Sequence, residues 1–104
     1  MSFNYGNMMK QAKMVQKKMQ EVQEELKKTQ FEASAGGGAV KVKVNGDQEV
    51  LEVKINSEMV DASDLEMVED MVLVALNDAI SQSKQEMQAK MAEITGGLNI
   101  PGMF

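Results

Sequence analysis

The chain has 104 residues, the size of one small domain, and a formal net charge of −5. It contains no Cys and no His, which excludes disulfides, thiolate or imidazole zinc sites, cysteine nucleophiles and Ser-His catalytic pairs. No apolar run is long enough to cross a membrane and no signal-peptide pattern opens the chain, so we expect a cytoplasmic protein without membrane contact, metal or cofactor.

The charge is divided along the sequence. Residues 1–28 carry six Lys and three Glu, a balance of +3, whereas residues 47–78 carry ten acidic residues and one Lys, a balance of −9. The negative total argues against generic nucleic-acid binding, whose usual signature is a basic domain. The basic first segment weakens that argument, because an average charge hides such a division.

The first predicted element is a helix over residues 8–29 with Asn7 as its N-cap. Its apolar residues recur at spacings of four and three, a heptad seam that predicts contact with another helix along most of its length. The seam residues are Met8, Ala12, Val15, Met19, Val22 and Leu26. The opposite face carries Lys10, Lys13, Lys17 and Lys28, with Lys18 to one side. Such a stripe is often only a solvated face, but no acidic residue precedes Glu21, and helix N-termini attract phosphate.

A three-stranded sheet is predicted over residues 30–55. Residues 30–35 form the first strand, and the triple glycine 36–38 follows as a turn or bulge, because a phosphate-binding loop requires Gly-Lys-Ser/Thr and then a helix. Period-two alternation of apolar and charged residues then predicts a hairpin. A four-residue loop over 45–48 sets Val42 opposite Leu51, Val40 opposite Val53 and Lys41 opposite Glu52. The helices are expected to cover the apolar face of this hairpin.

The second helix is predicted over residues 64–95, because Ser63-Asp64-Leu65-Glu66 fits a capping box. Its first half is apolar on two sides, so it requires two surfaces: the sheet, and either the first helix or a partner chain. Gly96-Gly97 is expected to end the helix. Residues 96–104 form an apolar tail that cannot continue the helix past Pro101, and this tail either docks or stays loose.

Element lengths predict that both helices project beyond the sheet. Helices of about 22 and 32 residues span roughly 33 and 48 Å, whereas strands of about six residues span about 20 Å. The free tip therefore holds the start of one helix and the end of the other, while the acidic residues 47–78 stay near the sheet. The lysines expected at this tip are Lys10, Lys13, Lys17, Lys18, Lys84 and Lys90.

Several short segments, taken in their order and spacing, carry a family resemblance over almost the whole chain. They are Met8-Met9-Lys10-Gln11-Ala12, the glycines 36–38 before Val40-Lys41-Val42, Asn45-Gly46, residues 65–70, Asn77-Asp78-Ala79, and Thr95-Gly96-Gly97-Leu98 with Pro101-Gly102. Together they closely resemble the YbaB/EbfC family of bacterial nucleoid-associated proteins.

The resemblance implies an α+β fold of αβββα order, with a three-stranded antiparallel sheet and two long flanking helices that project beyond it. It also implies a homodimer formed through the sheet, with tweezer-like helices. The implied partner is double-stranded DNA, bound with little sequence preference, and the implied role is nucleoid organisation or gene regulation. The DNA-binding candidates that follow are Lys10, Lys13, Lys17 and Lys18, together with Lys84 and Lys90. The chain has no Arg, so these lysines could position it on phosphates without reading sequence.

Two other functions are weighed against DNA binding. A protein–protein adaptor could use the Met-rich helices and the apolar tail to hold a protein partner, although core or dimer packing explains the same methionines. Glu66, Glu69 and Asp70 cluster on one helix, as residues of an acid–base or Mg²⁺ site can. Acidic residues in a first helical turn also complement the helix dipole, so an enzyme is not expected.

Overall fold

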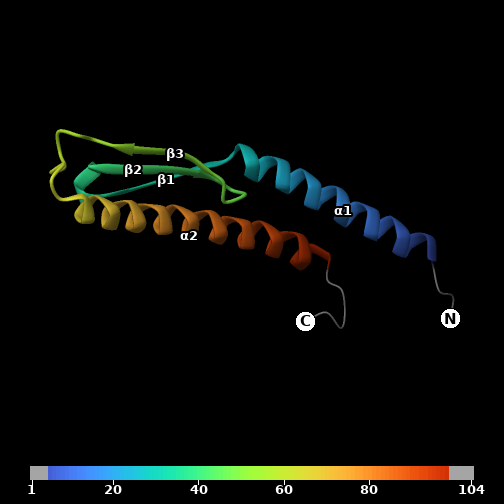
Figure 1. The fold of residues 1–104 in the computed structure, drawn as a ribbon. Helices are drawn as coiled ribbons and strands as arrows, with labels where there is room; N and C mark the ends of the chain where they lie inside the picture. The colour runs from blue at the N-terminus through green and yellow to red at the C-terminus, as the bar shows by residue number, and fades with distance from the viewer. Residues whose placement is uncertain (1–4, 99–104) are drawn as a thin grey trace.

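The computed structural model describes residues 5–98, which form two α-helices and a three-stranded antiparallel sheet (Figure 1). The helices are α1 (Tyr5–Lys28) and α2 (Leu65–Leu98). The strands are β1 (Gln30–Ala35), β2 (Val40–Asn45) and β3 (Val50–Ile55), with a short 3-10 turn, η1 (Gly36–Gly38), between the first two. This αβββα order confirms the predicted fold class. Residues 99–104 of the predicted apolar tail lie outside the described residues.

The helix ends differ from the predicted ones in three places. α1 begins at Tyr5, so Asn7 lies inside the helix and is not its N-cap. Asp64 caps α2, because its Oδ1 accepts a hydrogen bond from the Met67 N–H at 3.2 Å. Ser63 is not the cap, since its hydroxyl and its N–H both donate to Asp61 Oδ1. α2 continues through Gly96 to Leu98, because a helix tolerates glycine at a cost of about 1 kcal/mol.

The core lies between α2 and the first two strands. Val40, Val42 and Val44 point from one face of β2 toward α2 and are fully buried. Small side chains oppose them, which lets the helix approach the sheet closely: Ala33 on β1, and Ala75 and Ala79 on α2. The lysines between the valines therefore point to the opposite, outer face of the sheet.

The register of the β2–β3 hairpin differs from the predicted one by two residues along β3. Val40 pairs with Ile55 and Val42 with Val53, followed by a β-bulge between Lys43 and Val44. Because the register shifts by an even number of residues, the same side chains still lie on the predicted face of the sheet. Asn45 causes the difference: it stays in β2, its N–H donates to the Glu49 carbonyl, and its Oδ1 accepts from the N–H of Glu49 at 2.9 Å. The loop is consequently 46–49.

This hairpin turn holds both helices. The N–H of Gly46 donates to the carbonyl oxygens of Leu26, at 2.7 Å, and Thr29, at 3.0 Å, and so fixes the end of α1. On the other side, the buried hydroxyl of Ser83 in α2 donates to the Asn45 carbonyl at 2.8 Å. The end of α1 and the middle of α2 are thus tied to one tight turn.

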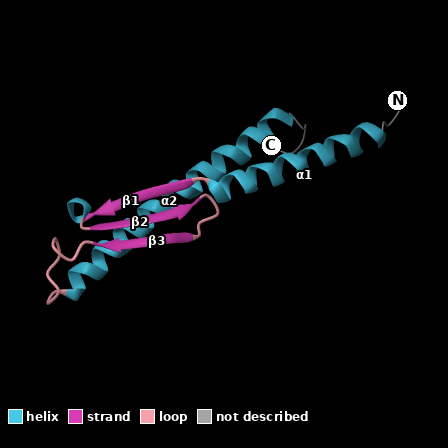
Figure 2. Ribbon diagram, turned by 90° about the horizontal axis from the view of Figure 1, so that it is seen from above, coloured by secondary structure: helices cyan, strands magenta, loops and turns pink. Residues whose placement is uncertain are grey.

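The two helices leave the sheet on the same side and run antiparallel (Figures 1 and 2). Their contact is short, because α2 spends its first half beneath the sheet. Leu26 is buried and Val22 is half-buried, but Met19 is 38% and Met8 is 54% exposed. Within the described residues, α2 thus covers only the end of α1, and packing of α1 on a helix along most of its length stays a prediction.

Replacing Gly46 with Ala is expected to destabilise the fold by about 1–3 kcal/mol through overpacking. A Cβ at this position would lie 2.6 Å from the Leu26 carbonyl oxygen and 2.8 Å from its Cα. The measurement is urea unfolding at matched protein concentration. Gly96→Ala is the control: no atom would lie within 4 Å of the new Cβ, so stability should stay equal or rise by up to about 1 kcal/mol. Equal midpoints for Gly46→Ala and the wild type would contradict the tight contact.

Candidate nucleic-acid interface

Residues 5–20 of α1, here called the arm, form a cationic rod without acidic residues. Its lysines, all exposed, are Lys10, Lys13, Lys17 and Lys18. Within residues 5–98 none of the four makes an ion pair, since the bridges formed there involve other lysines. At about 100° per residue, Lys10, Lys13 and Lys17 fall on the face opposite Val22 and Leu26. These three side chains therefore point away from α2.

The two lysines of α2 lie nearer the sheet than expected. Lys84 follows Ser83, which is bonded to Asn45, so it lies beside the hairpin turn. The Lys90 side chain is only 29% exposed, and its Nζ lies 3.9 Å from Glu25 Oε1 at the junction of the helices. The prediction that both gather at the tip is wrong, because α2 begins beneath the sheet and has travelled little beyond it by residue 90. Their contact with DNA stays a prediction.

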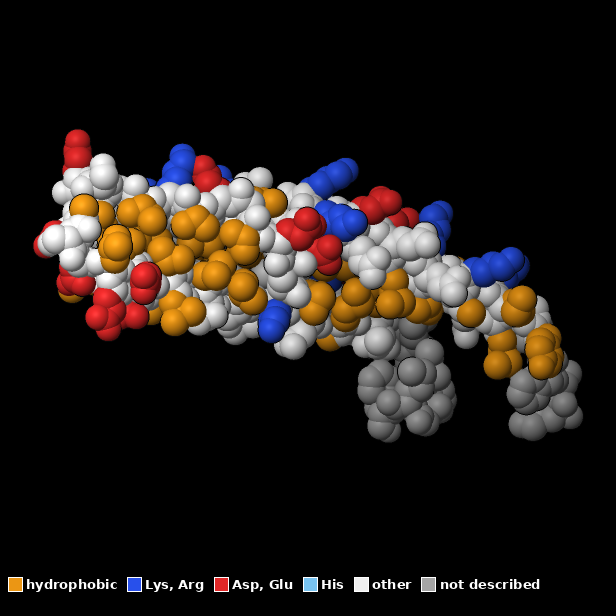
Figure 3. Space-filling model, viewed as in Figure 1, with side chains coloured by type: hydrophobic (Ala, Val, Ile, Leu, Met, Phe, Trp, Pro, Cys, Tyr) orange, Lys and Arg blue, Asp and Glu red, His pale blue; other side chains and the backbone are white. Residues whose placement is uncertain are grey.

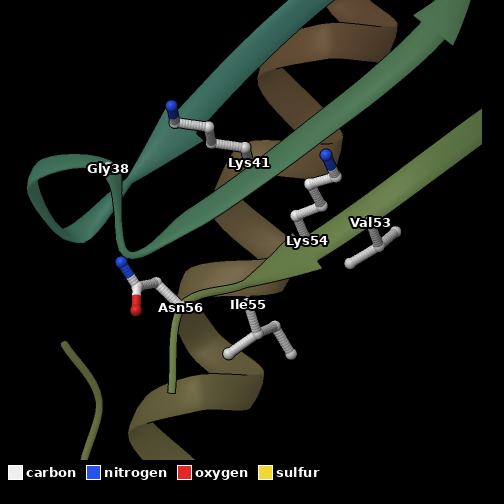
Figure 4. Close-up of a pocket in the computed structure, with 6 residues that line it drawn as sticks. All are labelled: Gly38, Lys41, Val53, Lys54, Ile55 and Asn56. Carbon is white, nitrogen blue, oxygen red and sulfur yellow. The ribbon is translucent and has the colours of Figure 1, made fainter. Parts of the chain in front are cut away.

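The outer face of the sheet carries lysines of a different kind. Glu52 forms ion pairs with Lys54 at 3.2 Å and with Lys43 at 3.6 Å. The hydrogen bond from Lys54, together with the charges of Lys54 and Lys43, holds the pKa of the Glu52 carboxyl below its ordinary value. Lys41 lies directly opposite Lys54, in a shallow open depression that Asn56 also lines (Figure 4). This face is therefore partly neutralised, unlike the arm.

Acidic side chains gather at the end of the molecule remote from the arm, on the connector before α2 and on its first turns. They are Glu58, Asp61, Asp64, Glu66, Glu69 and Asp70, all exposed. Figure 3 shows acidic side chains at that end and basic ones along α1. Hydrogen bonds from the Ser63 hydroxyl and N–H lower the pKa of Asp61. Within residues 5–98 no set of three acidic side chains is arranged to hold a metal ion.

Besides the arm, the described chain has an exposed apolar surface. Val53 and Ile55 of β3 pair with buried residues of β2 and face the same side as α2, yet they are 45% and 46% exposed. Figure 3 shows hydrophobic side chains gathered between β3 and α2. We call this surface the apolar face; its exposed members are Val50, Leu51, Val53, Ile55 and Leu73.

The expectation that the helices cover the hairpin holds for β2 only. α2 packs against β1 and β2. A helix about 10 Å wide covers two strands that lie about 4.8 Å apart, and the third remains uncovered. Neither helix, within the described span 5–98, has an apolar stretch long enough to cross a bilayer.

Comparisons with known proteins find relatives along the whole chain. The YbaB/EbfC DNA-binding family matches residues 1–98. A nucleoid-associated protein of Clostridium novyi is 50% identical over 101 residues, which cover 97% of this chain and 89% of that protein. One of Thermoanaerobacter pseudethanolicus is 47% identical over 102 residues, covering 98% and 92%, and one of Oceanobacillus iheyensis is 45% identical over all of both chains. These names indicate DNA-binding, nucleoid-associated proteins and not enzymes.

A solved structure shares the fold. The crystal structure of an uncharacterised protein from Helicobacter pylori matches with a TM-score of 0.76 at 22% identity. The match covers 85% of this chain and 92% of that one. At this identity the likeness supports the αβββα fold alone.

Proposed function

The chain belongs to the YbaB/EbfC DNA-binding family, and we propose that it is a nucleoid-associated protein that binds double-stranded DNA as a homodimer with little sequence preference. The observation that carries the proposal is the arm, which holds four exposed lysines and no acidic residue of its own. The role that fits this chemistry is nucleoid organisation or gene regulation, in the cytoplasm and at the nucleoid.

The spacing of the arm lysines suits a phosphate backbone. From Lys10 to Lys17 the helix rises about 10 Å, the axial length occupied by roughly three phosphates of one DNA strand. Lysines are flexible point charges, so they can follow this backbone without a fixed pairing geometry. Because the chain has no Arg, it lacks the planar guanidinium group whose fixed pairs of donors suit bidentate guanine contacts.

The apolar face supports the dimer. Apolar side chains on an exposed edge strand invite a second chain, and a two-fold contact covers the same surface on both copies. Two arms would then offer eight lysines, four from each chain. Binding by two linked arms is tighter than binding by one, because the second contact becomes intramolecular.

Salt should weaken DNA binding steeply. If all eight arm lysines neutralise phosphates, affinity for a duplex should fall by about 10⁴-fold between 50 and 200 mM salt. Fluorescence anisotropy of a labelled duplex across this range measures the slope.

The alternative function, a protein–protein adaptor that uses apolar side chains such as Met8, Met9 and Met14, predicts weak or no salt dependence for its own partner. Duplex affinity that is flat with salt would reject phosphate binding.

Charge reversal on the arm should abolish duplex binding while the fold persists. Replacing Lys10, Lys13 and Lys17 with Glu makes the phosphate-facing side repulsive, and a loss of at least about 100-fold in affinity is expected. The matched control reverses Lys27, Lys41 and Lys54, which gives the same net charge away from the arm. The control should retain affinity within about threefold of wild type at 150 mM salt, since screening limits remote charges. Equal losses in both variants would show that net charge decides binding, not the arm.

A charge in the apolar face should separate the dimer. Val53→Glu combined with Ile55→Glu buries two carboxylates against a second chain, so the variant should sediment as a monomer and bind DNA at least about tenfold more weakly. Ser34→Glu, on the outer face of β1, is the control and should leave both properties unchanged. Circular dichroism checks that each variant is folded. A monomeric wild-type protein, or a dimer that tolerates both carboxylates, would contradict this interface.

A further inference from the structure

A second apolar stripe of α2 stays largely exposed within residues 5–98. Met67, Met71 and Val74 recur at spacings of four and three, so they lie along one side of the helix. Met67 and Val74 are 57% and 60% exposed. We call these three residues the side stripe. Its own α1 does not cover it, because α1 meets α2 further along, near Lys90 and Ile94.

The side stripe is separate from the apolar face. Val74 lies about 100° around α2 from Leu73, which belongs to the apolar face. The side stripe borders the other edge of the sheet, since the Met71 Sδ lies against Gly36 and Asp78, next in the same spacing, lines a shallow pocket with residues of β1. The proposed homodimer uses the β3 side of α2, so it would leave the side stripe free.

Acidic residues surround the side stripe. Asp70 and Asp78 lie within about 70° of its centre, and Asp64 precedes Met67 by about one turn. All three are exposed, and α2 has no lysine before Lys84. Figure 3 shows acidic side chains next to hydrophobic ones at this end of the molecule. The partner that fits this surface is a helix with an apolar stripe and a positive charge.

The arm is such a helix. Its uncovered stripe consists of Met8, Ala12, Val15 and Met19. The spacings of four, three and four equal those from Met67 through Met71 and Val74 to Asp78, and both runs rise about 16 Å. Apolar residues at these spacings are the pattern by which two helices pack along each other. We propose that the arm of one copy docks on the side stripe of another copy.

Charge favours this contact over one between two arms. Lys18 lies about 90° and Lys13 about 130° from the centre of the arm stripe, so their long side chains can reach carboxylates beside the side stripe. Lys10 and Lys17 point away from the contact and stay exposed. Two arms packed along each other would instead set four lysines against four, and like charges repel.

The contact joins two different surfaces, so it can repeat from copy to copy. A contact of this kind that does not close into a ring builds a row of molecules. Assemblies larger than a dimer therefore follow, and they do not require DNA. The contact also gives the exposed part of the α1 heptad seam the helix partner that its spacing predicts.

Sedimentation velocity without DNA tests the assembly by exchanging charges. At about 10 mM salt, where charges act over about 30 Å, the wild type should form species heavier than a dimer as its concentration rises to about 0.5 mM. Asp70→Lys with Asp78→Lys should weaken this assembly at least about tenfold. Adding Lys13→Glu and Lys18→Glu to that variant should restore it to within about threefold of wild type.

The matched control is Glu24→Lys with Asp47→Lys, which changes the net charge equally at exposed sites remote from the start of α2. It should assemble within about threefold of wild type. A wild type that never exceeds a dimer, or equal weakening in the control, would overturn the proposal. Failure of the two added Glu substitutions to restore assembly would overturn the arm as the occupant.

Disulfide trapping between chains identifies the surfaces in contact, since the chain has no cysteine of its own. An affinity-tagged chain with Ala12→Cys is mixed with an untagged chain with Val74→Cys and oxidised. The mixed disulfide should form at least about tenfold faster than with Met14→Cys in the tagged chain, because residue 14 lies about 160° around α1 from Ala12. Equal rates would overturn the docking. Neither measurement uses DNA, so its failure and the failure of the proposed function are distinguishable.

Discussion

The hydrogen bonds from the Gly46 N–H to the Leu26 and Thr29 carbonyls determine where α1 points. Carbonyls at the end of an α-helix lack donors within the helix, and the hairpin turn supplies one here. The same turn is bonded to α2 through Asn45 and Ser83. The direction of α1 is thus set at its base by backbone groups and one buried hydroxyl. The residues of the arm take no part in this, so its surface is free to serve binding.

The position of α2 on the sheet decides which strand is left uncovered. Ala75 and Ala79 bring α2 close to β1 and β2, where it buries the three valines of β2. That close contact centres the helix on two strands and leaves the inner side chains of β3 half exposed. Moving α2 toward β3 would uncover β1 instead, because one helix cannot cover three strands. An uncovered face is therefore a result of the architecture, and the second chain of the proposed homodimer would bury it.

The sequence predicts the local elements well because their signals are local. Alternation of valine and lysine identifies β2 and its inner face, and the family resemblance agrees with the observed αβββα order. The hairpin register was missed because Asn45 uses its side chain to bond Glu49, which keeps it in the strand. The heptad seam shows that a helix face is apolar but not how far a partner extends along it. Lys84 and Lys90 were misplaced because the position of α2 along the sheet depends on Ser83 and Asn45, which are 38 residues apart.

The distribution of charge reconciles a net charge of −5 with a DNA-binding family. The described chain is 74 Å long, whereas charges in solution are screened over about 8 Å at physiological salt. The arm and the acidic end are therefore electrostatically independent. A polyanion near the arm meets four lysines on a segment that carries no carboxylate of its own, while one near the start of α2 meets a cluster of acids. In the proposed DNA complex, the acids at the start of α2 would disfavour approach at that end and the arm would favour approach at the tip, so the uneven charge would orient the protein on DNA.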